Sequence, residues 1–327
     1  MKQNKQIILM IDEEWTNYDK EKEIFKNEGL SFIPIRYVSK DFIFNEFKES
    51  IIGLIVRANI RIRKIDIYKL DNLKVICVTG SGFDCVDIDA ATKKNIVVVY
   101  QGDYCAREVA EHVIAMIFCF NKNLIWYNER VKKGIWQPDS QRPIKSMSNV
   151  TLGIVGFGYI GRSVANMAVS LGLNVLVYDP YIDKAFFDDL NVTSCNLKQL
   201  LSQSDYVSVH LPLVKETRNM FTEDLLNNMK QGSVFINTCR GGIVDEKALI
   251  KLIKNGHIGA AGLDVLKDEP PKSDNPLLEL KNTLITPHIA YRSIQSVEKV
   301  KIGAAKDVIR VLKRQDKPNF IANPEVW

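Results

Sequence analysis

Three glycines in residues 150–165, VTLGIVGFGYIGRSVA, have the spacing of a phosphate-binding turn. A short apolar run leads directly into Gly156-x-Gly158-x-x-Gly161, and a helical pattern follows. In such a turn the first glycine permits the tight bend, the second lets a pyrophosphate approach the backbone, and the third lets helix and strand pack closely. Free N–H groups and the dipole of the helix N-terminus then hold the phosphates.

An acidic residue at the end of the next predicted strand complements this turn. Asp179 stands in the sequence LVYDP. A carboxylate there accepts hydrogen bonds from the ribose hydroxyls of NAD and repels the 2′-phosphate of NADP. Lys184 lies nearby in the sequence and would attract that phosphate, so the strictness of the preference stays open. Turn, helix and acid together predict an NAD site.

Histidine is the side chain best suited to proton transfer near neutral pH, and the chain has only 4. His112 lies in an apolar helical stretch, which favours a packed core or interface role. His257 follows Asn255-Gly256 at a predicted helix end, which favours a capping or dipole role. His210 and His288 follow predicted strands, at the edge where open α/β sheets bind ligands. Position alone leaves both as candidates for acid–base catalysis.

Charged residues at further strand ends supply partners. Arg240 follows a predicted strand in INTCRGGIVDEKAL, where a guanidinium suits bidentate binding of a carboxylate. Asp264, Asp268 and Glu269, in GLDVLKDEPP, are each placed to partner a histidine. Spacing alone does not choose among them.

Two series of short strands and helices must position these residues. In the first hundred or so residues, β-branched runs such as 6–11 and 51–57 alternate with helix-sized polar segments, as in a parallel sheet buried on both faces. The second series begins at Val150, and its strand candidates are residues 151–155, 174–178, 206–210, 233–237, 260–264 and 283–286. The pattern predicts an α/β fold with doubly wound parallel sheets of the Rossmann or flavodoxin type.

The segments around the second series also carry predictions. Residues 103–122 have a helical pattern with an apolar stripe too broad for one packing surface, so this helix joins two domains, supports a dimer, or does both. Residues 132–149 are polar and predict a loop. A last amphipathic helix is expected at about 293–313.

Composition excludes several classes of protein. The 327 residues are 46% hydrophobic and 25% charged, which is typical of a globular chain of about two domains. A dispersed net charge of +5 is too weak for a nucleic-acid partner. The longest apolar stretch, 113–120, is too short for a membrane span, and the N-terminus lacks a signal-peptide cleavage site. Without a membrane span or a signal peptide, the expected location is the cytoplasm. The six cysteines have no metal-ligand spacing, which predicts reduced, buried thiols and no metal site.

Several segments in the same order resemble the D-isomer-specific 2-hydroxyacid dehydrogenase family. These segments are VGFGYIG, INTCRGGIVDEKAL, GLDVLKDEPP and TPHIA, with LKVICVTGSGFDCVDIDAA and EVAEH before them and KPNFIANPEV at the tail. The resemblance covers nearly the whole chain. It implies two doubly wound domains with the cleft between them, a discontinuous substrate domain (1–100 plus 292–327), an NAD-binding domain (101–291), and a homodimer joined through the NAD domains.

The resemblance also implies a role for each matching residue. Arg240 would bind the carboxylate and 2-oxo group of the substrate. His288 would be the acid in reduction and the base in oxidation, and Glu269 would hold its imidazole and favour the cation. The implied function is NAD(H)-dependent interconversion of a 2-oxo acid and a D-2-hydroxy acid.

Substrate and cofactor contacts follow from the same resemblance. Arg57, Ser81 and Gly82 would bind the substrate, while Tyr291 would either line the pocket or pack at the hinge. The residues expected to bind NAD are Val109, Gly156, Gly158, Tyr159, Ile160, Gly161, Asp179, Pro180, His210, Pro212, Thr217, Thr238, Cys239, Asp264 and Ala290.

Two departures leave alternatives open. Residues 101–105, QGDYC, stand where the family often has Pro-Gly, and with Tyr291 they resemble the branch of the C-terminal-binding-protein corepressors. The alternative function is therefore an NADH-sensing, corepressor-like binding protein with weak or no turnover. The basic residues Arg57, Arg61, Arg63 and Lys64 either suit a phosphorylated substrate such as 3-phosphoglycerate or form a solvated loop. The substrate side chain and the direction of the reaction are not predicted.

Overall fold

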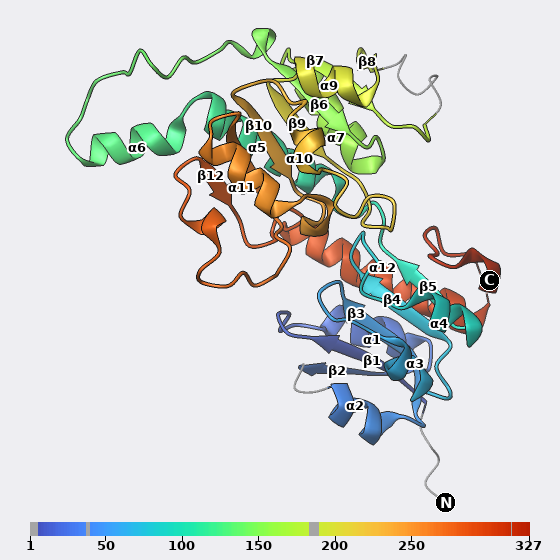
Figure 1. Cartoon of the computed structure of the whole chain (residues 1–327). Helices are drawn as coiled ribbons and strands as arrows, with labels where there is room; N and C mark the ends of the chain where they lie inside the picture. Colours follow the sequence, from blue (N-terminus) through green and yellow to red (C-terminus); the bar gives the residue numbers. More distant parts are fainter. Residues whose placement is uncertain (1–5, 37–39, 183–189, 315) are drawn as a thin grey trace, which may run out of the picture. The chain divides into compact units, whose positions relative to one another are not determined.

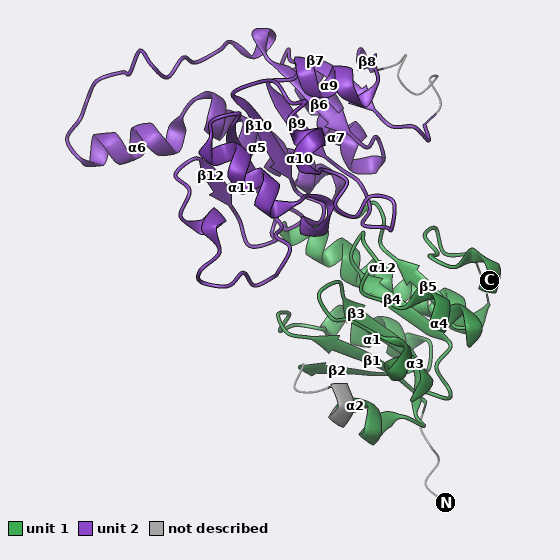
Figure 2. Ribbon diagram, viewed as in Figure 1, with its two compact units in different colours: residues 1–104, 293–327 green, residues 105–292 purple. Residues whose placement is uncertain are grey.

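The computed structural model describes residues 6–36, 40–182, 190–314 and 316–327, and every structural statement below concerns these residues (Figure 1). The chain divides into two compact units (Figure 2). Unit 1 comprises Met1–Tyr104 and Ser293–Trp327, and unit 2 comprises Cys105–Arg292. Each unit is built around one parallel sheet flanked by helices, which confirms the predicted α/β fold.

Unit 1 holds a five-stranded sheet with the order β2-β1-β3-β4-β5. Its strands are β1 (Ile7–Asp12), β2 (Ser31–Arg36), β3 (Ile51–Arg57), β4 (Val75–Thr79) and β5 (Val97–Tyr100). Its helices are α1 (Asp19–Asn27), α2 (Lys40–Phe47), α3 (Lys64–Tyr68), α4 (Ile88–Lys93) and α12 (Ile294–Lys313). From β1 the chain moves one way along the sheet to β2 and the other way to β3, so the topology switches between β1 and β3.

Both faces of the unit 1 sheet are covered, which explains its continuous apolar runs. All six residues of β1 are buried. Because side chains alternate along a strand, Leu9 packs in the cluster that includes α2, α3 and α4, whereas Met10 packs in the cluster that includes α1 and α12. Helix α12 therefore returns from the far end of the chain to complete the core of unit 1.

Unit 2 holds a seven-stranded parallel sheet with the order β12-β11-β10-β9-β6-β7-β8. Its strands are β6 (Thr151–Val155), β7 (Asn174–Tyr178), β8 (Thr193–Ser194), β9 (Tyr206–Val209), β10 (Ser233–Asn237), β11 (Ile258–Leu263) and β12 (Thr283–Ile285). Its helices are α5 (Ala106–Asn121), α6 (Leu124–Lys132), α7 (Tyr159–Ser170), α9 (Leu197–Gln203), α10 (Glu223–Leu226) and α11 (Glu246–Lys254). Helices α5 and α7 cover one face, and α9, α10 and α11 cover the other.

Two helices account for the apolar segments that surround the second series. Helix α5 buries Val109, Val113, Met116 and Ile117 and packs against α7, so its broad stripe serves the core of unit 2. Helix α6 buries no residue, and Figure 1 shows it standing apart from the sheet of unit 2. Among the described residues, no helix combines the length and hydropathy needed to cross a membrane.

Candidate functional site

The glycine turn joins β6 to α7, as predicted from its spacing. Gly156 has a φ of +94°, and a Cβ added there would lie 2.5 Å from the carbonyl oxygen of His210. A Cβ at Gly161 would overlap the carbonyl oxygen of Gly156, whereas a Cβ at Gly158 would meet no atom within 4 Å. Two glycines are thus required by the fold itself, and Gly158 borders open space at the N-terminus of α7. This arrangement fits a bound pyrophosphate.

Asp179 directly follows β7 and fastens the same turn. Its Oδ2 accepts a hydrogen bond of 2.8 Å from the Phe157 N–H, and its Oδ1 accepts one of 2.9 Å from the Tyr181 N–H. Each carboxylate oxygen has a second lone pair, so these bonds are compatible with a ribose hydroxyl as a further donor. Lys184 lies outside the described residues.

His288 and Glu269 form a hydrogen-bonded pair. The Nδ1 of His288 lies 2.7 Å from Oε2 of Glu269, and the Leu266 N–H donates to Oε1 at 3.1 Å. Burial by itself raises the pKa of Glu269, but the hydrogen bond and charge of His288, the Leu266 N–H and the charge of Arg240 outweigh it and lower the pKa. An ionised Glu269 places the proton of His288 on Nδ1, which leaves Nε2 for exchange with a substrate.

The backbone of His288 is held in an uncommon conformation, with a φ of +53°. Its N–H donates to the carbonyl oxygens of Asp264 at 2.8 Å and Thr286 at 3.0 Å. The Asp264 carboxylate, which is 1% exposed, accepts hydrogen bonds from the next two N–H groups, of Ile289 at 2.9 Å and Ala290 at 2.8 Å. Asp264 therefore shapes the loop that presents His288.

Two consecutive side-chain hydrogen bonds connect the loop that presents His288 to helix α5. The Thr286 hydroxyl donates to Oδ1 of Asp264 at 2.6 Å, and Nε2 of His112 lies 3.0 Å from the same hydroxyl. Because the hydroxyl hydrogen goes to the carboxylate, His112 must be the donor to Thr286. The sequence predicted a packed core or interface role for His112 and did not single out Thr286. The two residues are 174 positions apart in the chain, so only the folded structure reveals their contact.

Arg240 is set by a closed turn after β10. The buried Asn237 side chain accepts from the Cys239 N–H at 3.0 Å and donates to the Arg240 carbonyl at 2.9 Å. A Cβ at Gly241 would overlap the Leu266 backbone, so the turn after β10 lies directly against the turn after β11. The guanidinium is consequently near enough to Glu269 for its charge to lower the Glu269 pKa.

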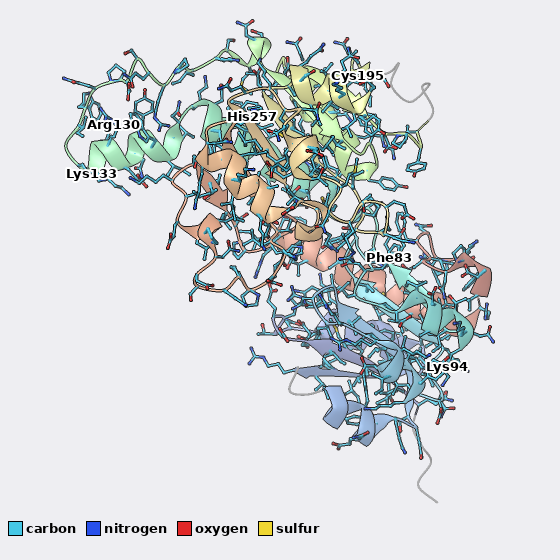
Figure 3. The ribbon with its side chains drawn as sticks, in the orientation of Figure 1. Phe83, Lys94, Arg130, Lys133, Cys195 and His257 are labelled. Atoms are coloured by element: carbon cyan, nitrogen blue, oxygen red, sulfur yellow. The ribbon has the colours of Figure 1, made fainter. Side chains whose placement is uncertain are left out.

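The other two histidine-bearing turns carry no acid–base pair. Burial lowers the pKa of His210 to about 3, and its Nε2 lies 2.9 Å from the Ser208 hydroxyl. A ring that stays neutral at physiological pH is no proton donor, so His288 alone remains of the two candidates. His257 lies in the turn after α11, where its N–H donates to the Asn255 side chain at 3.0 Å (Figure 3).

The remaining predicted cofactor residues of unit 2 lie on α5, on α7 and in the loops that follow β7, β9 and β10. Tyr159 and Ile160 form the first turn of α7, and Val109 is buried on α5. Thr217 ties its own loop by donating to the Pro212 carbonyl at 2.6 Å, and Pro180 follows Asp179. Beside Cys239, the buried Thr238 hydroxyl has no hydrogen-bond partner among the described residues, which fits a polar group of a bound cofactor.

In unit 1, the predicted substrate residues lie at or just after the carboxyl ends of β3 and β4. Arg57 ends β3 and pairs in register with Thr79, the last residue of β4, and Ser81 and Gly82 follow shortly after. Arg57 forms an ion pair with Glu14, which the sequence analysis did not single out. In unit 2, the Tyr291 ring lies edge-on to His288, with ring centroids 6.5 Å apart.

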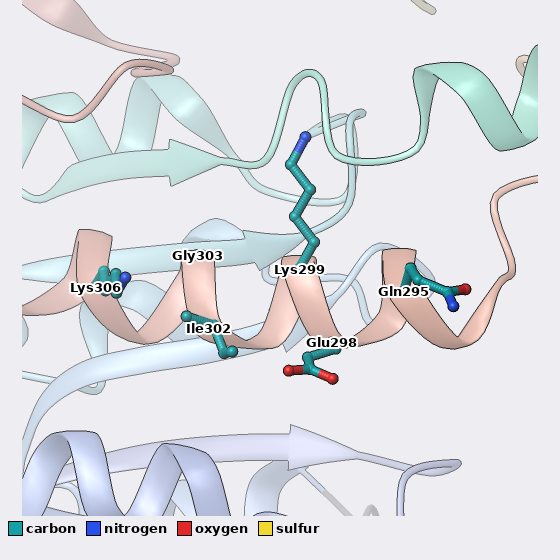
Figure 4. A pocket seen from close by; sticks show the side chains of 6 residues that line it. All are labelled: Gln295, Glu298, Lys299, Ile302, Gly303 and Lys306. Carbon is teal, nitrogen blue, oxygen red and sulfur yellow. The ribbon is translucent and has the colours of Figure 1, made fainter.

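A separate surface pocket of about 510 Å³ lies along α12 (Figure 4). Its lining residues are Gln295, Glu298, Lys299, Ile302, Gly303 and Lys306. None of the predicted site residues lines it.

Known proteins with similar sequences and structures agree with these features. Residues 114–290 match the model of the D-isomer specific 2-hydroxyacid dehydrogenase, NAD binding domain. Glycerate dehydrogenase of Methylorubrum extorquens is 38% identical over 70% of this chain and 73% of its own length. D-3-phosphoglycerate dehydrogenase of Archaeoglobus fulgidus is 36% identical over 84% of this chain, which spans only 52% of that relative.

Solved structures extend the similarity over both units. D-lactate dehydrogenase from Aquifex aeolicus, complexed with NAD and lactic acid, superimposes with a TM-score of 0.85 at 31% identity, covering 94% of this chain and 96% of that one. The predicted cofactor, NAD(H), and the predicted family are thereby confirmed. The chain belongs to the D-isomer-specific 2-hydroxyacid dehydrogenases, a family of NAD-dependent oxidoreductases.

Proposed function

We propose that the protein interconverts a small 2-oxo acid and its D-2-hydroxy acid through Arg240, Glu269 and His288. The observation that carries this proposal is the 2.7 Å pair of His288 and Glu269 beside Arg240, in the unit that also holds the glycine turn. The presence of these groups favours a catalytically active dehydrogenase over an NADH-sensing binding protein without turnover.

Each of the three side chains has one task in the proposed mechanism. NADH, when bound, supplies the hydride for the 2-oxo carbon. Arg240 binds the substrate carboxylate and orients the oxo group, and Nε2 of His288 donates the proton to the oxo oxygen. Glu269 stabilises the imidazolium while His288 is protonated and keeps the ring oriented. In the direction of oxidation, neutral His288 accepts the hydroxyl proton at the same atom.

The two units divide the work in this proposal. Unit 2 binds NAD through the glycine turn, Asp179 and the residues around Thr238, whereas unit 1 contributes Arg57, Ser81 and Gly82 to substrate binding. Tyr291, which lies beside His288, lines the substrate side of the imidazole. The proposed functional domains keep the sequence-based boundaries, 1–100 plus 292–327 for the substrate and 101–291 for NAD.

A homodimer through unit 2 completes the proposal. Helix α6 and the segment after it expose the apolar side chains Leu124, Ile125, Val131, Ile135, Trp136 and Ile144, with exposed fractions of 40% to 83%. Figure 3 marks this region by Arg130 and Lys133. Since this surface finds no cover in its own unit, a second copy of the same surface is the proposed partner.

The proposed location is the cytoplasm. Six free cysteines, three of them buried, suit a reducing compartment. Immunodetection in fractionated cells of the source organism tests this location, and recovery outside the cytosolic fraction would refute it.

The decisive experiment is an NADH-oxidation screen with purified protein. The panel contains glyoxylate, hydroxypyruvate, pyruvate, longer branched and aromatic 2-oxo acids and phosphorylated ones, each repeated with NADPH. We expect a clear preference for one acid, with kcat/KM above about 10⁴ M⁻¹s⁻¹. Protein that binds NADH but reduces none of these acids would contradict the proposal and favour cofactor-dependent partner binding.

A further inference from the structure

The carboxyl ends of β1 and β3 meet at the topological switch point of the unit 1 sheet. In the strand order 2-1-3-4-5, ligands bind outside the carboxyl ends of the strands on either side of that point. Asp12 is the last residue of β1, Arg57 is the last residue of β3, and Glu14 and Trp15 follow β1 directly. These four residues therefore occupy the position in unit 1 at which a ligand is expected.

Arg57 is already engaged there by acidic groups. Its Nη1 pairs with Oε2 of Glu14 and lies 3.7 Å from Oδ1 of Asp12. The guanidinium also lies over the Trp15 ring, with its Cζ 5.5 Å from the ring centroid. Two carboxylates thus surround one guanidinium, and this cluster of three charged groups is acidic on balance.

The loop that carries Glu14 is fixed by its own hydrogen bonds. The fully buried Asp12 carboxylate accepts the Glu14 N–H at 2.9 Å, the Trp15 N–H at 3.0 Å and the Tyr18 hydroxyl at 2.7 Å. The Lys301 ammonium also lies near the Trp15 ring, with its Nζ 5.4 Å from the ring centroid. Glu14 is consequently presented to Arg57 by a loop that is anchored independently of the ion pair.

The nearby basic residues do not reverse this balance, because the charge of Lys301 is offset by Glu21, whose Oε1 lies 3.1 Å from the Lys301 ammonium. Arg61 and Arg63 are exposed in the connection from β3 to α3, and the exposed Lys64 is the first residue of α3. The indole Nε1 of Trp15, by contrast, is buried and has no hydrogen-bond partner among the described residues. An uncharged polar group would satisfy this donor without meeting a like charge.

We propose that Glu14 is a specificity-determining residue that restricts the protein to 2-oxo acids with an uncharged side chain, because it holds Arg57 in an ion pair that a phosphate would have to break. The inference rests on the proposed function, since it takes Arg57 as the substrate-side arginine. A phosphorylated side chain meets two carboxylates and an occupied guanidinium, and like-charge contacts of this kind discriminate against the wrong partner. A hydroxymethyl side chain meets neither obstacle.

The test compares hydroxypyruvate with its 3-phosphate, which differ only in the charged group. Wild-type protein is expected to prefer hydroxypyruvate. Glu14→Gln removes the charge at nearly constant shape, and Glu14→Ala removes the whole group. Both should raise the ratio of kcat/KM for the phosphate ester to that for hydroxypyruvate by at least about tenfold, which corresponds to about 1.4 kcal/mol.

Glu13→Gln is the matched control. Glu13 is the exposed neighbour in the same loop, so this variant makes the same change in net charge at the adjacent position. The ratio should stay at its wild-type value. Equal shifts in the Glu13 and Glu14 variants, or a wild-type protein that uses the phosphate ester as well as hydroxypyruvate, would overturn the proposal.

Calorimetry separates this inference from the proposed function. In the complex with NAD⁺, which has no hydride to give, the phosphate ester should bind at least about tenfold more tightly to Glu14→Gln than to wild type. Unchanged affinity would refute the role of Glu14 whatever the turnover. A wild-type protein that reduces no 2-oxo acid would refute the proposed function, while the calorimetric comparison still decides the role of Glu14.

Discussion

Proton transfer in the proposed site depends on which nitrogen of His288 carries the hydrogen. Glu269 fixes this choice because its carboxylate accepts from Nδ1 at 2.7 Å. The residue is thus a positioning group as well as a source of charge. The His210 ring differs, because its Nε2 lies 2.9 Å from the Ser208 hydroxyl and burial lowers its pKa to about 3.

We expect His288→Gln to lower kcat by about 10²-fold or more while the dissociation constant for NADH stays within a few-fold of wild type, because general acid catalysis contributes about 10²–10⁴-fold. Stopped-flow turnover and NADH fluorescence titration measure the two quantities. His257→Gln, in the turn after α11, is the control. A kcat close to wild type for His288→Gln would show that another group donates the proton.

Glu269 also links stability to pH. Its pKa is lowered from the ordinary value of 4.5, so its ionised form stabilises the folded state above the unfolded pKa, and this contribution disappears as the pH falls through the folded pKa. Glu269→Gln should therefore destabilise the protein more at pH 7 than at about pH 4. Urea unfolding at both pH values measures the difference. An equal loss at both would argue against the ionised pair.

At the scale of elements, the β6–α7 turn separates the demands of folding from those of binding. Gly156 and Gly161 are required by contacts within the chain, whereas Gly158 faces open space. The same sequence motif therefore contains two kinds of glycine, and their substitutions should have different consequences.

Gly158→Ala should fold with near wild-type stability yet bind NADH at least about tenfold more weakly, because the added methyl group occupies space proposed for the pyrophosphate. Gly161→Ala should lower the free energy of unfolding by several kcal/mol, because its Cβ overlaps the Gly156 carbonyl. Chemical denaturation and calorimetric titration of both variants provide the comparison. Loss of stability in Gly158→Ala with unchanged NADH affinity would contradict the assignment.

The loop that presents His288 depends on the end of β12. Thr286→Val removes the hydroxyl that donates to Asp264 at 2.6 Å and leaves a buried carboxylate short of one donor, at a cost of about 1–3 kcal/mol. Thr286→Ser keeps the donor and should restore both stability and kcat. Thermal unfolding and turnover measure the pair. A serine variant as damaged as the valine variant would show that packing of the methyl group matters instead.

Local patterns in the sequence were enough to predict most of the strands and helices and the residues of the motifs. Strands such as β6 and β10 are short apolar runs that local periodicity detects, and Gly156, Arg240 and His288 stand in fixed positions after strands. Contacts that arise only in three dimensions, such as His112 with Thr286 and Glu14 with Arg57, left no local signal. Helix α6 was also missed, because its nine residues bury no side chain in their own unit and give only a short, weak periodic pattern.

At the scale of the molecule, the exposed surface of α6 predicts concentration-dependent assembly. Leu124→Glu with Trp136→Glu should shift the protein from dimer to monomer, because charge on an apolar interface is costly. Light scattering coupled to size exclusion measures the mass. Ile65→Glu, on the exposed part of α3 in unit 1, is the control. A wild-type monomer at micromolar concentrations would refute this interface.

Unit 1 is assembled from two separate segments of the chain, which affects how it folds during synthesis. Helix α12 covers the sheet face that includes Ile8 and Met10, yet almost two hundred residues of unit 2 are made between them. On the ribosome, domains fold as units once their chain has emerged. Unit 2 can therefore finish folding while unit 1 still waits for its last helix, with one face of its sheet covered only in part, by α1. At about 5–20 residues per second, that face stays exposed to chaperones for about ten seconds or longer in every round of translation.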